Sequence, residues 1–177
     1  MLGVGDVIVV TGPPGSGKST VAERLADLFD PSALVTGDDF FAFLRNGAIP
    51  PWLESAHQQN ATVIEAAAAA CERLSLHCHL VYDGVVGPWF LEAFLGAAKL
   101  NHLHYALLLP PLELCLERVS IRQGHGFTDR DAAEHMWHDF HRANVAARHV
   151  IDDHHKQPGE IARRLAQQVG DGTILYP

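Results

Sequence analysis

The sequence predicts an α/β fold in which a five-stranded parallel sheet is covered by helices on both faces. Short apolar runs alternate with amphipathic helical patterns along the chain. Strands that are apolar throughout are typical of parallel sheets buried on both sides. The expected strands are 7–11, 34–36, 80–82, 103–109 and 149–151. The expected helices are 18–29, 39–46, 55–75, 88–98, 111–122, 129–146 and 158–169.

Each element is justified by its own residues. The first expected strand contains the apolar run 7–10, and the segment 18–29 repeats apolar residues at helical spacing. The longest expected helix carries a run of alanines at 66–70, which favours close packing on the sheet. Pro88 and Pro158 fit the first turn of a helix, where the missing N–H of proline costs nothing.

Composition indicates one globular domain over residues 1–177. Hydrophobic residues make up 47% and charged residues 19%, as in an ordinary globular protein. A net charge of −8 argues against non-specific nucleic-acid binding, which needs a basic surface. The three cysteines form no C-x-x-C pair and are expected to be free thiols. Free thiols are typical of the reducing cytoplasm, so we expect a cytoplasmic protein. No apolar stretch could span a bilayer, so we expect no membrane partner; the oligomeric state stays open.

The strongest functional signal is the segment 12–20, which matches G-x-x-x-x-G-K-[ST] between the first strand and the first helix. Its glycines let backbone N–H groups converge on anionic phosphates, and the helix points its positive dipole end at the same place. Lys18 would bridge the β- and γ-phosphates of ATP, and the Ser19 hydroxyl would bind Mg²⁺. The fold is then a three-layer α/β/α P-loop NTPase. The predicted nucleotide site is Gly12, Pro13, Pro14, Gly15, Ser16, Gly17, Lys18, Ser19 and Thr20.

Two further strand ends carry carboxylates, at the edge where open α/β sheets bind their ligands. Asp38 and Asp39 follow the second strand, and Asp83 ends the third. Asp38 is the candidate base for an attacking hydroxyl, because it lies nearer the strand end than Asp39; a helix cap is the alternative. Asp83 matches a Walker-B carboxylate that holds Mg²⁺, with a strand-capping role as the alternative.

Residues 118–130 predict a small lid. Arg118 and Arg122 lie four residues apart on one helix face, ahead of a glycine-rich loop. A closing lid would bring guanidinium charge onto the transferring phosphoryl group. Two arginines on a solvated helix face are the alternative interpretation.

Together these motifs resemble the P-loop small-molecule kinases, in particular the chloramphenicol phosphotransferase-like group and the kinase domain of polynucleotide kinases. The resemblance spans about residues 6–152. It implies that Asp38 is the general base and that Arg118 and Arg122 are lid arginines. It also implies that the loop after Ile151 faces the adenine of ATP.

The chain departs from the relatives that act on phosphorylated acceptors. Polynucleotide kinases place an arginine shortly after the aspartates, where this chain has Phe41; Arg45 is the first arginine to follow. The segment Thr36-Gly37-Asp38 also resembles nucleoside-monophosphate kinases, which hold an acceptor phosphate with arginines. The matching stretches here, 40–41 and 85–87, carry no cation. We therefore expect a neutral or weakly charged hydroxyl compound, with nucleic acid unlikely as a partner.

The acceptor pocket is predicted from polar hydrogen-bonding residues near aromatic ones. The segment 50–53 leads into the long helix, whose first turns are polar. An exposed polar helix start is the alternative. The candidate acceptor residues are Asp39, Arg45, His57, Gln58, Asn60 and Trp89, with Phe90 as part of the wall.

The sequence as a whole predicts an ATP- and Mg²⁺-dependent phosphotransferase that moves the γ-phosphoryl group to a hydroxyl of a small molecule, such as an antibiotic or a metabolite. The alternatives are a nucleotide or polynucleotide kinase and a non-catalytic nucleotide-binding regulatory module. A GTPase would need an N-K-x-D motif, which does not occur. His135, His138 and His141 share a helix face and suggest zinc, but a solvated surface explains them as well.

Overall fold

The structure is a computed structural model and describes residues 5–121 and 129–177. Its sheet has the strand order β2-β3-β1-β4-β5, and every pairing along this path is parallel. The predicted five-stranded parallel sheet is therefore confirmed. A sixth strand, β6, pairs antiparallel with β4; its two residues are too few to show a periodicity. The strands are β1 (Val7–Thr11), β2 (Ser32–Thr36), β3 (His79–Asp83), β4 (Leu103–Leu108), β5 (Val150–Ile151) and β6 (Leu175–Tyr176).

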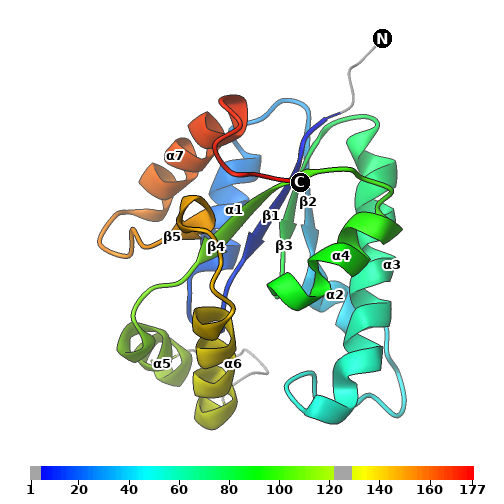
Figure 1. The fold of residues 1–177 in the computed structure, drawn as a ribbon, viewed down its shortest axis with the longest axis vertical. Coiled ribbons are helices and arrows are strands. Elements are labelled where there is room, and N and C mark those ends of the chain that lie inside the picture. Colours follow the sequence, from blue (N-terminus) through cyan, green and yellow to red (C-terminus); the bar gives the residue numbers. More distant parts are fainter. Residues whose placement is uncertain (1–4, 122–128) are drawn as a thin grey trace.

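Helices cover both faces of this sheet, as the sequence predicts (Figure 1). Helices α1 and α7 pack on one face, and α3 and α4 pack on the other. Helices α5 and α6 lie side by side, toward the end of the molecule to which the β1 arrow points. The α-helices are α1 (Lys18–Ala26), α2 (Gly37–Phe41), α3 (His57–Ser75), α4 (Pro88–Ala97), α5 (Leu112–Ile121), α6 (Arg130–Arg142) and α7 (Pro158–Gly170). Two 3₁₀ helices are η1 (Glu54–Ala56) and η2 (Ala147–His149).

Alternate side chains of β1 divide between two core layers. Val7 and Val9 belong to the layer under α3 and α4, whereas Ile8 and Val10 belong to the layer under α1 and α7. All four side chains are buried. Burial on both faces explains why the strands read as unbroken apolar runs rather than as an alternation.

Several helices are shorter than the sequence predicts; α1, expected at 18–29, ends at Ala26, and α2 and α6 also end early. The helix expected at 39–46 is α2, which starts at Gly37 and ends at Phe41, and exposed residues follow it. The helix expected at 129–146 is α6, which ends at Arg142. Asn144 has a φ of 50°, and a helix cannot continue through this left-handed conformation.

The strand ends that carry the predicted site residues meet at one edge of the sheet. β2, β3 and β1 are neighbours and parallel, so Thr36, Asp83 and Thr11 end side by side. The segments that follow these strands therefore converge, as expected for a ligand site in an open α/β sheet.

Two further predictions concern the lid and the membrane. Most of the predicted lid, and Arg122 with it, lies outside the described residues, whereas Arg118 lies within them. No helix in the described part of the chain combines the length and the apolar character that crossing a bilayer requires.

Candidate active site

The loop between β1 and α1 is a tight turn with two glycines in left-handed conformations. The N–H of Ser16 donates to the carbonyl of Pro13 at 3.1 Å. Gly17 precedes α1 with a φ of 88°. Gly15 has a φ of 80°, and a Cβ there would overlap the backbone carbonyl of Cys115. Only glycine satisfies both conditions at residue 15, so α5 packs directly against the loop.

Arg118 of α5 forms hydrogen bonds with the backbone of this loop. Its Nη1 donates to the carbonyl oxygens of Gly15, at 3.2 Å, and Ser16, at 3.4 Å. The same side chain lines a small pocket of about 350 Å³ together with His154 and Lys156, which follow β5. Arg118 thus places a guanidinium beside the loop, facing the side of the molecule that the resemblance assigns to adenine.

Two buried polar atoms on the phosphate side of this site have no hydrogen-bond partner among the described residues. They are Ser16 Oγ, within the loop, and Asp83 Oδ1, at the end of β3. A buried polar atom without a partner costs free energy, so such atoms in a folded protein call for an explanation. A phosphate oxygen or a cation would supply the missing interaction.

The environment of Asp83 suits a cation. The residue is 6% exposed. Burial raises the pKa of the Asp83 carboxyl, and the charges of Asp38 and Glu23 act in the same direction. Lys18 and a hydrogen bond with the Ser19 hydroxyl lower this pKa in part. A carboxylate beside a hydroxyl offers the oxygen ligands that Mg²⁺ prefers, so Ser19 and Asp83 fit the predicted metal site.

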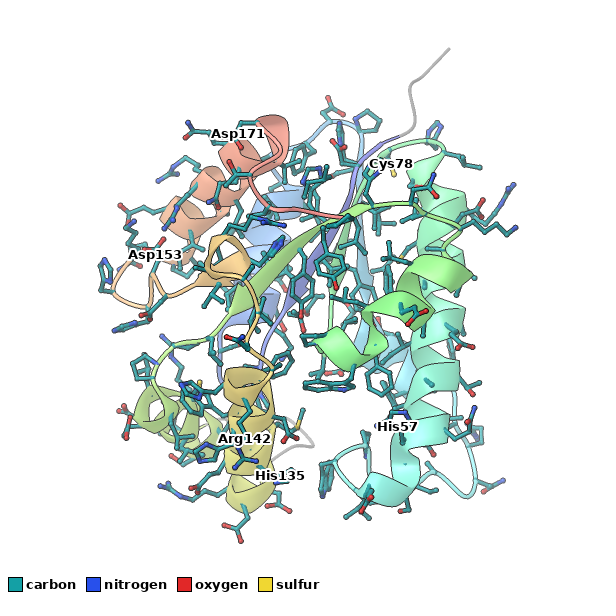
Figure 2. All side chains as sticks on the ribbon, in the orientation of Figure 1. His57, Cys78, His135, Arg142, Asp153 and Asp171 are labelled. Carbon is teal, nitrogen blue, oxygen red and sulfur yellow. The ribbon has the colours of Figure 1, made fainter. Side chains whose placement is uncertain are left out.

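A large pocket of about 780 Å³ begins at the phosphate loop and extends into the space between helices α3 and α6. Pro14 and Lys18 line it on the loop side, and Asp38 lines it from α2. His57 on α3 and His135 on α6 also line it, and both lie in the lower part of the view in Figure 2. The structure therefore brings the predicted phosphate-binding lysine and the predicted base into the wall of one cavity.

Three of the predicted acceptor residues line this large pocket: His57, Asn60 and Trp89. The His57 ring stacks on Phe90, with ring centroids 5.1 Å apart. The Asn60 side-chain amide donates to the carbonyl of Pro51 at 2.6 Å, which holds the segment before η1 against α3. Trp89 remains 44% exposed, so part of its ring is open to a ligand.

The other predicted acceptor residues, Asp39, Arg45 and Gln58, are not in the pocket wall. Asp39 follows Asp38 on α2, and successive residues of a helix point about 100° apart. Gln58 is exposed one step beyond His57 on α3 for the same reason. Arg45 is exposed in the loop after α2, where the expected helix does not continue.

The sequence did not predict the part of the pocket wall that α6 contributes. His135, Met136 and Asp139 line the large pocket from this helix, and Tyr82 and Glu54 line it from β3 and η1. The spacing of His135 and Asp139 was visible in the sequence, but it fits an exposed ion pair equally well. Tyr82 precedes Asp83 in β3, and nothing in the local pattern shows that it lines a cavity.

The helix that carries three histidines has local partners for each of them. His135 lies 3.4 Å from Asp139, and His138 lies 3.9 Å from Glu134. His141 stacks on Trp137 at 4.9 Å. The described residues contain no group of three or more His, Cys, Asp or Glu side chains that could hold a metal ion.

Comparison with known proteins identifies the family. The family model described as AAA domain matches residues 7–147, which is most of the chain, so the chain belongs to this family of P-loop proteins. No curated protein matches it.

Solved structures with the same fold include small-molecule kinases. The tunicamycin resistance protein of Deinococcus radiodurans has a TM-score of 0.70 at 21% identity, over 94% of this chain and 96% of that one. Shikimate kinase from Acinetobacter baumannii, solved in complex with shikimate, has a TM-score of 0.68 at 19% identity, over 95% and 94%. A gluconokinase from Sinorhizobium meliloti 1021 has a TM-score of 0.67 at 19% identity, over 96% and 94%. The chain thus has the fold of P-loop kinases.

Proposed function

We propose that this protein is an ATP- and Mg²⁺-dependent kinase that transfers the γ-phosphoryl group of ATP to a hydroxyl of a small molecule. The observation that carries the proposal is the shared cavity: Lys18 of the phosphate loop and Asp38 of α2 line the same pocket as His57, Asn60 and Trp89. A binding module without an acceptor has no need of a large second compartment beside its phosphate site. The small-molecule kinases among the structural neighbours agree with this proposal.

The phosphate side of the site is built by residues of the loop and of β3. The loop amides and Lys18 would hold the β- and γ-phosphates and stabilise the charge of the transition state. Ser19 and Asp83 would hold Mg²⁺, which neutralises phosphate charge when bound. Arg118, already bonded to the loop carbonyls, would keep the loop in its binding shape.

Asp38 would act on the acceptor. Its carboxylate takes the proton of the attacking hydroxyl as the oxygen of that hydroxyl bonds to the γ-phosphorus. The bond between the γ-phosphorus and the oxygen that bridges it to the β-phosphate breaks in the same displacement, which yields ADP and a phosphate monoester. The proton leaves Asp38 to solvent when the products depart.

The proposed acceptor is a small molecule that carries no phosphate group. Among the described residues, Lys18 is the single lysine or arginine in the wall of the large pocket, and its proposed role is on the phosphates of ATP. A phosphate on the acceptor would lack its charge-assisted partners there.

The three cysteines, Cys71, Cys78 and Cys115, are buried free thiols, which suits the reducing cytoplasm that we propose as the location.

Acceptor-dependent ADP release tests this function. The purified protein with ATP and Mg²⁺ would be screened against sugars, amino alcohols, aromatic alcohols, nucleosides, nucleotides and oligonucleotides with a 5′-hydroxyl. We expect at least one small hydroxyl compound to raise ADP release and to gain a phosphoryl group by mass spectrometry. Lys18→Met should lower this rate by about 10³-fold, while Lys99→Met, an exposed lysine beyond α4, should not.

Two results would overturn the proposal. Preferred phosphorylation of nucleotides or of oligonucleotides would make the protein a nucleotide or polynucleotide kinase. ATP binding with slow hydrolysis that no hydroxyl compound stimulates would make it a regulatory nucleotide-binding module.

A further inference from the structure

The acceptor side of the large pocket combines aromatic walls with carboxylates. Phe41, Trp52, Trp89 and Phe90 supply the rings, from α2, the segment before η1, and α4. Glu54 and Asp139 supply carboxylates from η1 and α6. These two carboxylates come from parts of the chain that are far apart in sequence, and the fold brings both to one cavity.

The charges of this pocket are unevenly distributed. Its wall contains the carboxylates Asp38, Glu54 and Asp139 against Lys18 as the single permanent cation among the described lining residues. In the proposed mechanism Lys18 binds the phosphates of ATP and Asp38 binds the acceptor hydroxyl. The permanent charges that remain in the described wall are the carboxylates of Glu54 and Asp139. His135 pairs with Asp139 at 3.4 Å but leaves that side chain 38% exposed.

The rings are arranged so that a ligand can contact them. Trp89 is 44% exposed, and its ring packs against Phe140 at a centroid distance of 5.3 Å. Gly87 lies against this ring, and a Cβ there would overlap it, so the glycine lets the tryptophan fold back toward the core. Aromatic faces attract cations, most strongly those of tryptophan.

We infer that the acceptor is a hydroxyl compound that carries a basic amine, protonated at neutral pH, next to an apolar or aromatic body. The inference rests on the proposed function, since it names the chemical class of the acceptor. The carboxylates of Glu54 and Asp139 and the tryptophan faces favour an ammonium group on this side of the pocket, and the apolar body fills the space between the rings. A carboxylate or phosphate in the same place is repelled by the two carboxylates.

A matched set of three probes tests the charge preference directly. Phenylalaninol, N-acetylphenylalaninol and 3-phenyllactate have the same benzyl group and a hydroxyl, and they carry a positive, a neutral and a negative charge. Binding is measured by isothermal titration calorimetry to the full chain with Mg²⁺ and a non-hydrolysable ATP analogue. We expect phenylalaninol to bind about tenfold more tightly than its acetylated form, from partly exposed ion pairs and ring contacts, and 3-phenyllactate to bind most weakly.

Substitutions at the two carboxylates assign the preference to the pocket. Glu54→Gln and Asp139→Asn should each reduce the preference for phenylalaninol over its acetylated form by about threefold, with the affinity for the acetylated form unchanged. Glu65→Gln on α3 and Asp131→Asn on α6 are the matched controls, because both residues are exposed and outside the pocket wall. The controls should keep the full preference.

The outcomes separate this inference from the proposed function. Equal or tighter binding of the acetylated or carboxylate probe, or no binding of phenylalaninol, overturns the inference, whatever the kinase assay shows. A preference for the amine that the two pocket variants leave intact overturns it as well. The proposed function fails on a different readout, when no hydroxyl compound stimulates ADP release.

Discussion

The phosphate loop and the acceptor side of the large pocket are built on opposite principles. The loop comes from one continuous segment, its shape is set by backbone conformation, and most of its residues are buried. The acceptor side comes from α2, η1, α3, α4 and α6, its surface is made of side chains, and much of it is exposed.

The difference shows where this fold allows variation. A phosphate group is the same in every nucleotide, so a rigid cradle of amides serves any reaction that uses it. The acceptor differs between enzymes, and side chains on several helices can be changed without disturbing the sheet. Substitutions should therefore damage folding and ATP binding at the loop, and acceptor affinity at the pocket.

The largest effect on stability is expected at Gly15 in the phosphate loop. Gly15→Ala places a Cβ against the carbonyl of Cys115 and forces a non-glycine residue to a φ of 80°. Backbone strain and overlap together cost roughly 2–5 kcal/mol, which lowers Tm by about 10 °C in a domain of this size. Differential scanning calorimetry measures the change.

Gly96→Ala is the matched control for this substitution. Gly96 lies in α4 with open space where its Cβ would stand, and alanine in a helix is more stable by about 0.5–1 kcal/mol. We expect its Tm to rise slightly. A Gly15→Ala protein that melts within a degree or so of the wild type would contradict the description of the loop.

A smaller effect, confined to the acceptor, is expected at Trp89. Trp89→Ala removes a ring from the pocket wall and should raise the KM for the acceptor by about tenfold, while the KM for ATP stays unchanged. Phe43→Ala is the control, since Phe43 is 72% exposed and outside the pocket wall. Steady-state kinetics with both substrates varied would decide, and an equal rise in both KM values would show that the two regions are not independent.

The smallest effect is expected on the free energy of unfolding, which the buried carboxylate of Asp83 lowers at neutral pH. Because burial raises its pKa in the folded state, the folded protein holds this proton more tightly than the unfolded chain does. Stability is therefore lost as pH rises through the raised pKa. Asn does not titrate, so Asp83→Asn should be more stable at pH 7 by about 1 kcal/mol, with a smaller gain nearer the ordinary pKa of aspartate.

Urea unfolding of the wild type and of Asp83→Asn between pH 4 and 8, without nucleotide or metal, would measure the gap between their free energies of unfolding. The variant should at the same time lose Mg²⁺-dependent activity. A gap that is constant with pH, or a variant that is less stable at pH 7, would show that Asp83 is already satisfied within the protein.

The sequence predicted those parts of the molecule that depend on neighbouring residues. Five strands and the loop before α1 follow from apolar runs and from a motif in which every residue acts locally. Asp38 was preferred over Asp39 from its distance to the strand end, and of the two only Asp38 lines the pocket. The role of each residue in catalysis stays a prediction.

The rest depended on contacts between distant segments. Trp89 and Asp139 line the same cavity although fifty residues separate them, and no local pattern reports that distance. Arg45 was assigned to the pocket as the first arginine after the aspartates, but α2 ends at Phe41 and Arg45 is exposed in the loop beyond it, outside the pocket wall. The wall from α6 was hidden because His135 and Asp139 have the spacing of an ordinary surface pair.

The pair Asp38→Asn and Asp39→Asn tests whether Asp38 is the residue that accepts the proton of the acceptor hydroxyl. The two substitutions remove the same charge from adjacent residues of α2, and the structure places only Asp38 in the wall shared with Lys18. With the best acceptor of the screen, we predict that Asp38→Asn lowers kcat by about 10²–10⁴-fold with the KM for ATP unchanged, and that Asp39→Asn stays near wild type. Equal loss in both variants, or wild-type turnover in Asp38→Asn, would contradict the account.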